Sequence, residues 1–173
     1  LTIQCPAITV DPATVPGGVA GVAYAGATFT QAGGVGTIAW SVIGTLPAGM
    51  SLNPVSGLLS GTPLQTGPFT FTVRATDANS CFGERSVTLT IACPTISVLP
   101  GGPLGGVEGT AITPVTFSQS GGVGTVAWTS SGALPNGLSF SGTGVLSGTP
   151  VGGSAGSYTV TFIATDSNGC QGS

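Results

Sequence analysis

The sequence predicts an all-β protein made of two tandem copies of one antiparallel β-sandwich. Three observations predict this fold class. Segments such as Phe69–Thr76 alternate strictly between apolar and polar residues, the pattern of a strand with one buried face. Clusters of Gly, Pro, Asn and Ser interrupt these segments about every ten residues, which is typical of a sandwich. The same motifs return about 88 residues later, and such internal repetition indicates two homologous modules.

Four short motifs define the repeat. In each pair the first module precedes the second: GGVGTIAW at Gly33–Trp40 and GGVGTVAW at Gly121–Trp128, LPAGMSL at Leu46–Leu52 and LPNGLSF at Leu134–Phe140, LLSGTP at Leu58–Pro63 and VLSGTP at Val145–Pro150, ATDANSC at Ala75–Cys81 and ATDSNGC at Ala164–Cys170. The offset between the two copies is 88 residues for the first two motifs, 87 for the third and 89 for the fourth, so loop lengths differ slightly within a fixed plan. We therefore expect one module at 1–92 and a second at 93–173.

We expect about seven strands in each module. In the first module they are Ile8–Val10, Ala27–Gln31, Thr37–Ile43, Met50–Leu52, Gly57–Ser60, Phe69–Thr76 and Ser86–Ile91. Six aromatic residues on these strands are predicted to form the two cores: Phe29, Trp40, Phe71, Phe117, Trp128 and Phe162. Because a sandwich buries the Trp of a central strand, we interpret both Trp residues as core residues rather than as platforms for sugar rings.

The composition excludes several classes of function. Charged residues make up 4% of the chain, the cations are Arg74 and Arg85 alone, and there is no Lys or His. A basic surface for nucleic acid, a Ser–His–Asp triad and a GxxxxGK phosphate loop are therefore excluded. No apolar run reaches the roughly 20 residues of a membrane-spanning helix. We expect no enzyme, no cofactor, no nucleic-acid partner and no membrane span.

The acidic residues offer little metal-binding chemistry. They are Asp11, Asp77, Glu84, Glu108 and Asp166, and only Asp77 and Asp166 occupy equivalent places in the two modules. Calcium prefers six to eight oxygen ligands, which so few carboxylates supply with difficulty. An Asp followed two residues later by Asn is also typical of a turn in which the carboxylate binds backbone N–H groups. We favour this turn-shaping role and expect no metal site.

Taken together, the motifs resemble a known family. The order LPxGxSL, GxLSGTP and an alternating strand that ends in ATDxxxC is similar to the "putative Ig" repeats of bacterial surface and secreted proteins, also described as dystroglycan-type cadherin-like domains. The resemblance covers nearly the whole chain twice. It implies two tandem Ig-like β-sandwiches, an extracellular setting and a spacer, adhesive or filament-building role. The junction TIACPTI lacks the acidic residues of calcium-dependent cadherin linkers.

The resemblance also implies how the four cysteines pair. In an Ig-like sandwich, the turn before the last strand lies at the same pole as the start of the first strand. We therefore expect the disulfides Cys5–Cys81 and Cys93–Cys170. The rival pair Cys81–Cys93 is separated by a strand of roughly 30 Å, whereas a disulfide tolerates a Cα separation of about 7 Å. Paired cysteines indicate a compartment outside the cytosol.

The second module is expected to lack its own last strand. Leu1, Thr2 and Ile3 resemble the end of the strand Ser86–Ile91, whereas only Gln171, Gly172 and Ser173 follow Cys170. An incomplete sheet exposes an edge that recruits another strand. Either residues beyond Ser173 supply that strand in a longer array, or Leu1–Ile3 of a second copy does so in a head-to-tail assembly. With only Ala92 between the last strand and Cys93, adjacent modules are expected to form a stiff rod.

These expectations lead to two hypotheses of function. The first is a structural repeat of a bacterial extracellular filament, stalk or adhesin, joined end to end by strand completion and strengthened by disulfides. Its partners are neighbouring copies or adjacent modules, and its Ser and Thr residues are candidates for O-linked glycans that cover a surface poor in charge. The second is a module of a secreted protein that binds carbohydrate or protein.

Overall fold

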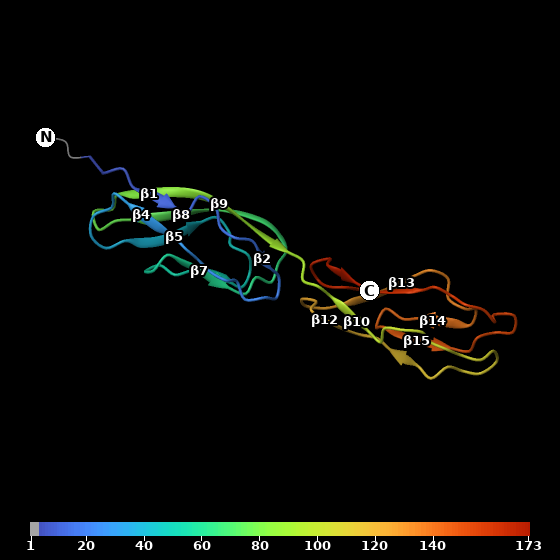
Figure 1. Cartoon of the computed structure of the whole chain (residues 1–173). Helices are drawn as coiled ribbons and strands as arrows, with labels where there is room; N and C mark the ends of the chain where they lie inside the picture. The colour runs from blue at the N-terminus through green and yellow to red at the C-terminus, as the bar shows by residue number, and fades with distance from the viewer. Residues whose placement is uncertain (1–3) are drawn as a thin grey trace. The chain divides into compact units, whose positions relative to one another are not determined.

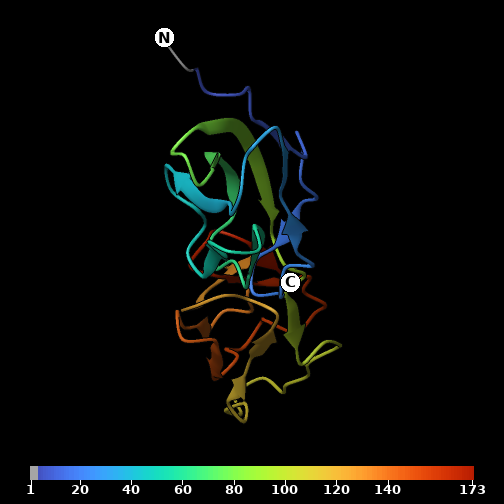
Figure 2. The same cartoon turned by 90° about the vertical axis from the view of Figure 1, so that its left-hand side faces the viewer.

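The computed structural model describes residues 4–173, and within this range every regular element is a β-strand. The predicted all-β fold class is therefore confirmed. The chain divides into two compact units, Leu1–Cys93 (unit 1) and Pro94–Ser173 (unit 2), whose strands are coloured in chain order in Figures 1 and 2. The described residues hold no helix long and apolar enough to cross a membrane. The expected donor residues Leu1–Ile3 lie outside the described residues.

Unit 1 consists of two main sheets and a strand pair. The larger sheet has the order β2 (Gly18–Val19), β9 (Phe82–Ala92), β8 (Gly67–Thr76), β5 (Ala39–Ile43); the smaller has the order β3 (Ala27–Thr28), β7 (Leu58–Gly61), β6 (Met50–Leu52); and β1 (Thr9–Asp11) pairs with β4 (Thr30–Ala32). All these pairings are antiparallel except that of β2 with β9, which is parallel.

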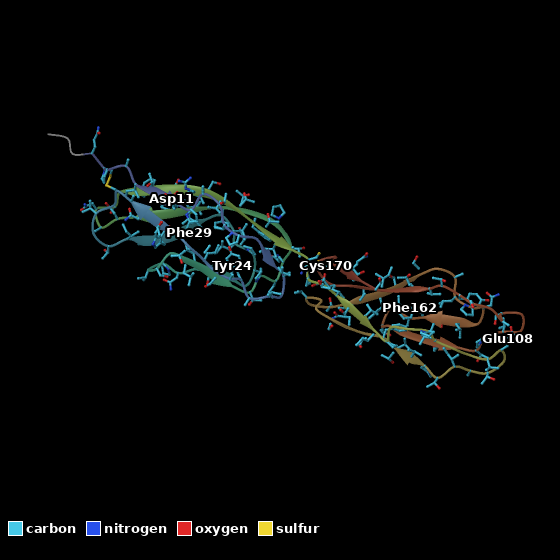
Figure 3. All side chains as sticks on the ribbon, viewed as in Figure 1. Asp11, Tyr24, Phe29, Glu108, Phe162 and Cys170 are labelled. Atoms are coloured by element: carbon cyan, nitrogen blue, oxygen red, sulfur yellow. A yellow bond between two sulfur atoms is a disulfide. The ribbon has the colours of Figure 1, made fainter. Side chains whose placement is uncertain are left out.

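The hairpin of β8 and β9 supplies a large part of the core of unit 1. Ten residue pairs join the two strands, from Gly67 opposite Ile91 to Thr76 opposite Phe82. Because side chains alternate across a strand, every second residue faces inward. The inward residues of β9 are almost completely buried: Val87 is 2% exposed, Leu89 0% and Ile91 2%. Phe29, which is 1% exposed, lies within the body of the same unit (Figure 3).

Unit 2 repeats this plan with shorter counterparts of β8 and β9. Its sheets have the orders β13 (Ala127–Ser131), β16 (Thr161–Thr165), β17 (Gln171–Gly172) and β11 (Val115–Thr116), β15 (Val145–Gly148), β14 (Leu138–Phe140), and β10 (Ser97–Leu99) pairs with β12 (Ser118–Ser120). Its core comprises Ile96, Phe117, Trp128, Leu146, Ala164 and Cys170. The ring of Phe117 lies 6.3 Å from that of Trp128 and 4.3 Å from that of Phe162, measured between centroids.

The structure divides one expected strand of unit 1 and adds one that was not expected. The expected strand Ala27–Gln31 is divided at Phe29, because β3 pairs with β7 and β4 pairs with β1. At the division, Phe29 is 1% exposed and its N–H donates to Gly57 O over 2.9 Å. The short parallel strand β2 was not expected, and it lies beside the end of β9, with Gly18 opposite Ile91.

The expectation that unit 2 lacks a last strand needs a correction. Gln171 and Gly172 form β17, which pairs with β16 so that Gly172 lies opposite Ala164 and Gln171 opposite Thr165. In unit 1, Gly83 lies opposite Ala75 and Phe82 opposite Thr76. The last strand of unit 2 therefore begins in the same register as β9. It covers two residues of β16, whereas β9 covers all ten residues of β8.

Candidate functional site

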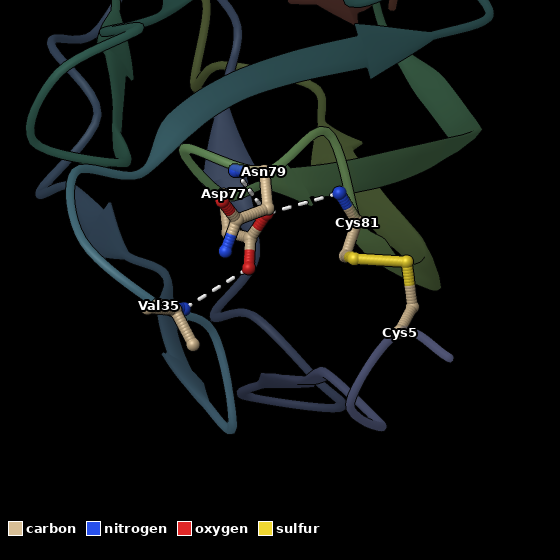
Figure 4. The surroundings of a disulfide bond; sticks show 5 residues. All are labelled: Cys5, Val35, Asp77, Asn79 and Cys81. Atoms are coloured by element: carbon tan, nitrogen blue, oxygen red, sulfur yellow. Dashed lines mark hydrogen bonds between the residues drawn. A yellow bond between two sulfur atoms is a disulfide. The ribbon is translucent and has the colours of Figure 1, made fainter. Parts of the chain in front are cut away.

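A turn centred on Asp77 joins three segments at one pole of unit 1. The Asp77 carboxylate accepts three backbone hydrogen bonds: Oδ1 binds the N–H groups of Asn79 and Cys81, each at 2.9 Å, and Oδ2 binds the N–H of Val35 at 3.0 Å (Figure 4). In return, Val35 O accepts from the N–H of Ala78. The carboxylate thus connects the GGVG turn to the turn that precedes β9, which is the turn-shaping role expected from the sequence.

Unit 2 contains the same arrangement around Asp166. Its Oδ1 accepts from the N–H groups of Asn168 at 2.8 Å and Cys170 at 2.9 Å, and its Oδ2 accepts from the N–H of Val123 at 2.9 Å. Asp77 and Asp166 are each 5% exposed. Their oxygens are therefore occupied by backbone donors inside the protein.

These hydrogen bonds lower the pKa of both carboxyl groups. For Asp77 the bond from Val35 has the largest effect, and the bonds from Cys81 and Asn79 add to it against the opposing effect of burial. For Asp166 burial is the largest influence and raises the pKa, but the bonds from Val123, Cys170 and Asn168 together outweigh it. Backbone N–H groups favour the charged form of a carboxylate, so both groups stay ionised in the folded protein at neutral pH.

A disulfide closes the same pole. Cys5 and Cys81 are joined with a Cα separation of 5.5 Å, as expected, and the bond encloses the turn that Asp77 shapes (Figure 4). Cys93 and Cys170 are also disulfide-bonded, and no described cysteine is free. Since Cys5 and Cys81 are joined to each other, the second disulfide joins Cys93 to Cys170.

The six aromatic residues proposed for the cores are largely enclosed. Phe29, Trp40, Phe71, Phe117 and Trp128 are 1%, 7%, 2%, 5% and 9% exposed, and Phe162 packs against the core of unit 2 while remaining half-buried. The Trp rings therefore offer no exposed face to a sugar. Within residues 4–173, no group of three or more His, Cys, Asp or Glu side chains is placed to hold a metal ion.

The feature that distinguishes unit 2 is an apolar groove beside β16. It has a volume of about 1350 Å³. Its lining includes Val98, Val115, Phe117, Leu138, Leu146, Tyr158, Val160, Phe162 and Ser173. It also extends to Glu108, which lies at the opposite end of unit 2 from Cys170 (Figure 3). Within the described residues, the strand partners of Thr161–Ile163 all lie on β13.

Unit 1 shows what fills the equivalent space. With the register of Ala164 opposite Gly172 extended along the chain, Gly156–Ile163 correspond to Gly67–Arg74, which pair with Glu84–Ile91 of β9. In unit 1 the space is therefore filled by the side chains of Val87, Leu89 and Ile91. The groove beside β16 therefore lies where β9 lies beside β8 in unit 1.

The side chains around the groove are correspondingly more exposed. Val10 and Val73 are 1% and 0% exposed in unit 1, whereas their counterparts Val98 and Phe162 are only half-buried. Tyr158, the counterpart of half-buried Phe69, is 43% exposed. The difference between the units is therefore concentrated where β9 lies in unit 1.

Both cations of the chain contact β9 or belong to it. Arg74 Nε donates to Glu84 Oε1 over 2.7 Å, and the Arg74 guanidinium lies 4.4 Å from the ring centroid of Phe82. Arg85 donates from Nε to Val10 O, and its second guanidinium nitrogen lies 3.2 Å from Asp11 Oδ1. These two ion pairs, which sequence reasoning missed, are specific to unit 1.

Comparison with known proteins agrees with this architecture. The model of a family described as "Putative Ig domain" matches residues 6–92 and again residues 97–173. Two similar curated proteins are both described as "Serine-rich adhesin for platelets", from Staphylococcus aureus and its strain MRSA252. They are 31% and 30% identical to this chain over 142 residues, or 81% of the chain. The chain matches only 6% and 10% of their lengths.

Solved structures give weaker likenesses. Drosophila N-cadherin EC1-4 matches 96% of this chain and 47% of its own at 12% identity, with a TM-score of 0.44. A "putative alpha-galactosidase" from Bacteroides fragilis matches 53% of this chain and 19% of its own at 21% identity, with a TM-score of 0.42. At these scores neither structure carries an argument about function.

Proposed function

The chain belongs to the family described as "Putative Ig domain", and on that premise we propose that it is a structural repeat segment of a bacterial extracellular adhesin, stalk or filament. Its relatives named as adhesins support this proposal. The two disulfides support a location outside the cytosol, where such bonds persist.

The observation that carries the proposal is that the two units share a structural turn and a disulfide-bonded cysteine. Asp77 and Asp166 bind the same set of backbone N–H groups, and each is followed four residues later by a disulfide-bonded cysteine. These shared groups hold loops and strands together. Among the described residues, no shared constellation offers a nucleophile, a general base or a metal ligand set. Groups that only hold loops and strands together are what we expect in a protein whose role is mechanical.

The second part of the proposal is assembly by strand completion. A strand edge with unpaired backbone groups recruits another strand, and alternate side-chain pockets give such pairing its specificity. The groove beside β16 combines an open edge with an apolar floor. Neighbouring modules are therefore the partners that we propose for this segment.

The mechanical role is tested by stretching the full chain from its two termini in a single-molecule force experiment. The Cys5–Cys81 bond encloses a separation of 76 residues, which at about 3.3–3.6 Å per residue corresponds to roughly 250–270 Å of extended chain. When unit 1 unfolds under force, we expect the oxidised form to gain less length than the reduced form, and the difference should equal this enclosed length. The matched control is the variant with Cys5→Ser and Cys81→Ser, which should show the full length without reductant. Units that extend with no resolvable unfolding force would contradict a mechanical role.

A further inference from the structure

We infer that the strand completing unit 2 carries an uncharged, apolar residue at the position that Arg85 occupies in β9, and that the groove thereby rejects strands of the β9 type. This inference rests on the strand completion proposed above. The occupant is a strand in line with β17, because Gln171 and Gly172 already hold its first two register positions and Ser173 lines the groove.

The first observation concerns the position of Glu84. In unit 1, Glu84 lies opposite Arg74 and is bound to it by a short ion pair. In unit 2 the counterpart of Arg74 is Ile163, and the residue that follows Gly172 is Ser173. Both members of the ion pair have therefore been replaced by uncharged residues. The last strand of unit 2 therefore differs from β9 at the position of Glu84.

The second observation concerns the next position, that of Arg85. Arg85 lies opposite Val73 on the inward face of β9, and its side chain is 33% exposed. It is held there by Val10 O and by the carboxylate of Asp11. The counterpart of Asp11 is Leu99, since Asp11 pairs with Thr30 and Leu99 with Ser118 in matching registers. A guanidinium at this place in unit 2 would find a carbonyl group but no carboxylate.

The surroundings of that place in unit 2 are aromatic and apolar. Phe162 replaces Val73, and its ring lies 4.3 Å from that of Phe117 and 4.7 Å from that of Phe140, measured between centroids. Leu99 is 60% exposed and carries no charge, so it cannot replace the carboxylate of Asp11. Partial burial of a cation without an opposite charge is unfavourable, whereas an apolar side chain would cover Phe162.

This arrangement provides a basis for strand selection. Strands with the same alternation of apolar and polar residues can all pair with the open edge of β16. Specificity then depends on unfavourable contacts between the groove and the wrong strand. Glu84 and Arg85 match Arg74 and Asp11 in unit 1, whereas neither has an opposite charge in unit 2. The inserted β9 of another copy is therefore disfavoured in the groove of unit 2.

The test is a double-mutant cycle on the full chain. One chain is extended after Ser173 by a copy of the eight residues Arg85–Ala92, and a second by the same eight residues with valine in place of the arginine. Each extension is made with Leu99 and with Leu99→Asp, a substitution at an exposed site. A control extension replaces the copies of Val87, Leu89 and Ile91 with serine. Calorimetry gives the Tm of unit 2, and hydrogen exchange reports protection of residues 156–163.

The arginine extension and the valine extension should both raise the Tm of unit 2 and protect residues 156–163. The serine control should do neither. With Leu99 present, the valine extension should exceed the arginine extension by about 4–8 °C. Leu99→Asp should reduce or reverse that order. Stabilisation by both extensions without this coupling overturns the inference about selection and leaves strand completion intact. Failure of both to change the Tm or the exchange overturns strand completion as well.

Discussion

Gly172 of β17 lies so close to the backbone oxygen of Ile96 that a Cβ at this position would overlap with it. Gly83 of β9 stands in the same relation to Ile8 O in unit 1. Backbone cannot move aside as a flexible side chain does, so glycine is required where the last strand crosses the first. The shared contact indicates that β17 lies in the place where β9 begins in unit 1.

Gly83→Ala should therefore destabilise unit 1 by about 1–3 kcal/mol, the usual range for an overpacked site. Gly172→Ala should cost unit 2 less, because β17 can detach with the loss of only two residue pairs. Gly142→Ala is the matched control, since a Cβ there meets open space. Thermal unfolding of the three variants checks the order, and an equal response of all three would contradict it.

Asp77→Asn should lower the Tm of unit 1 at neutral pH, because the amide cannot accept all three backbone hydrogen bonds. The folded-state pKa is lowered, so the ionised carboxylate contributes stability above the unfolded value of about 3.9. That contribution is lost as the pH falls through the lower folded-state pKa.

The difference in Tm between wild type and Asp77→Asn should accordingly shrink as the pH falls below about 4. Asp166→Asn should act in the same way on unit 2, since its pKa is also lowered. A gap in Tm that stays constant between neutral and strongly acid pH would show that the carboxylate charge plays no part.

Replacing Cys5 and Cys81 together with serine should destabilise unit 1 by about 4–5 kcal/mol in the chain-entropy account of a long closed loop. Unit 2 should keep its transition, because the disulfide of Cys170 with Cys93 is untouched. Calorimetry of the oxidised variant measures both transitions, and an unchanged unit 1 would contradict a stabilising role for this bond.

Ser80→Gly should stabilise unit 1 slightly. Ser80 has a φ of 66°, a left-handed conformation that L residues with a side chain rarely adopt, and its counterpart Gly169 has a φ of 79°. Relief of this strain is worth about 1–2 kcal/mol, from which the extra flexibility of unfolded glycine subtracts about 0.5–1 kcal/mol. The reverse change, Gly169→Ser, should destabilise unit 2; denaturant midpoints of the two variants should shift in opposite directions.

Much of the fold could be predicted because alternation and repetition are strong signals. The strand Met50–Leu52 is observed with its expected ends. The expected strand Phe69–Thr76 lies within the longer β8. The residues missed have weak local signals. β2 and β17 are two residues long, too short to alternate, and β2 also depends on a partner far away in the chain, the end of β9.

The candidate site was predictable only in part. The recurrence of Asp77 and of the GGVG motif indicated two turns, but the bond between Asp77 and Val35 spans 42 residues and depends on the fold. The replacements of Asp11 by Leu99 and of Arg74 by Ile163 are visible in the sequence. The sequence does not show that both replacements remove a charge that pairs with β9. That is seen only when the register places Glu84 opposite Arg74 and when Arg85 is found to pair with Asp11.

The account depends most on the claim that, within residues 4–173, β17 covers only two residues of β16, whereas β9 covers the whole of β8. Hydrogen exchange of the oxidised full chain tests it within one sample. We predict that the β8 amides that donate to β9, within residues 67–74, exchange slowly, while their counterparts within residues 156–163 exchange much faster. Equal protection of the two segments in the monomeric chain would contradict the claim.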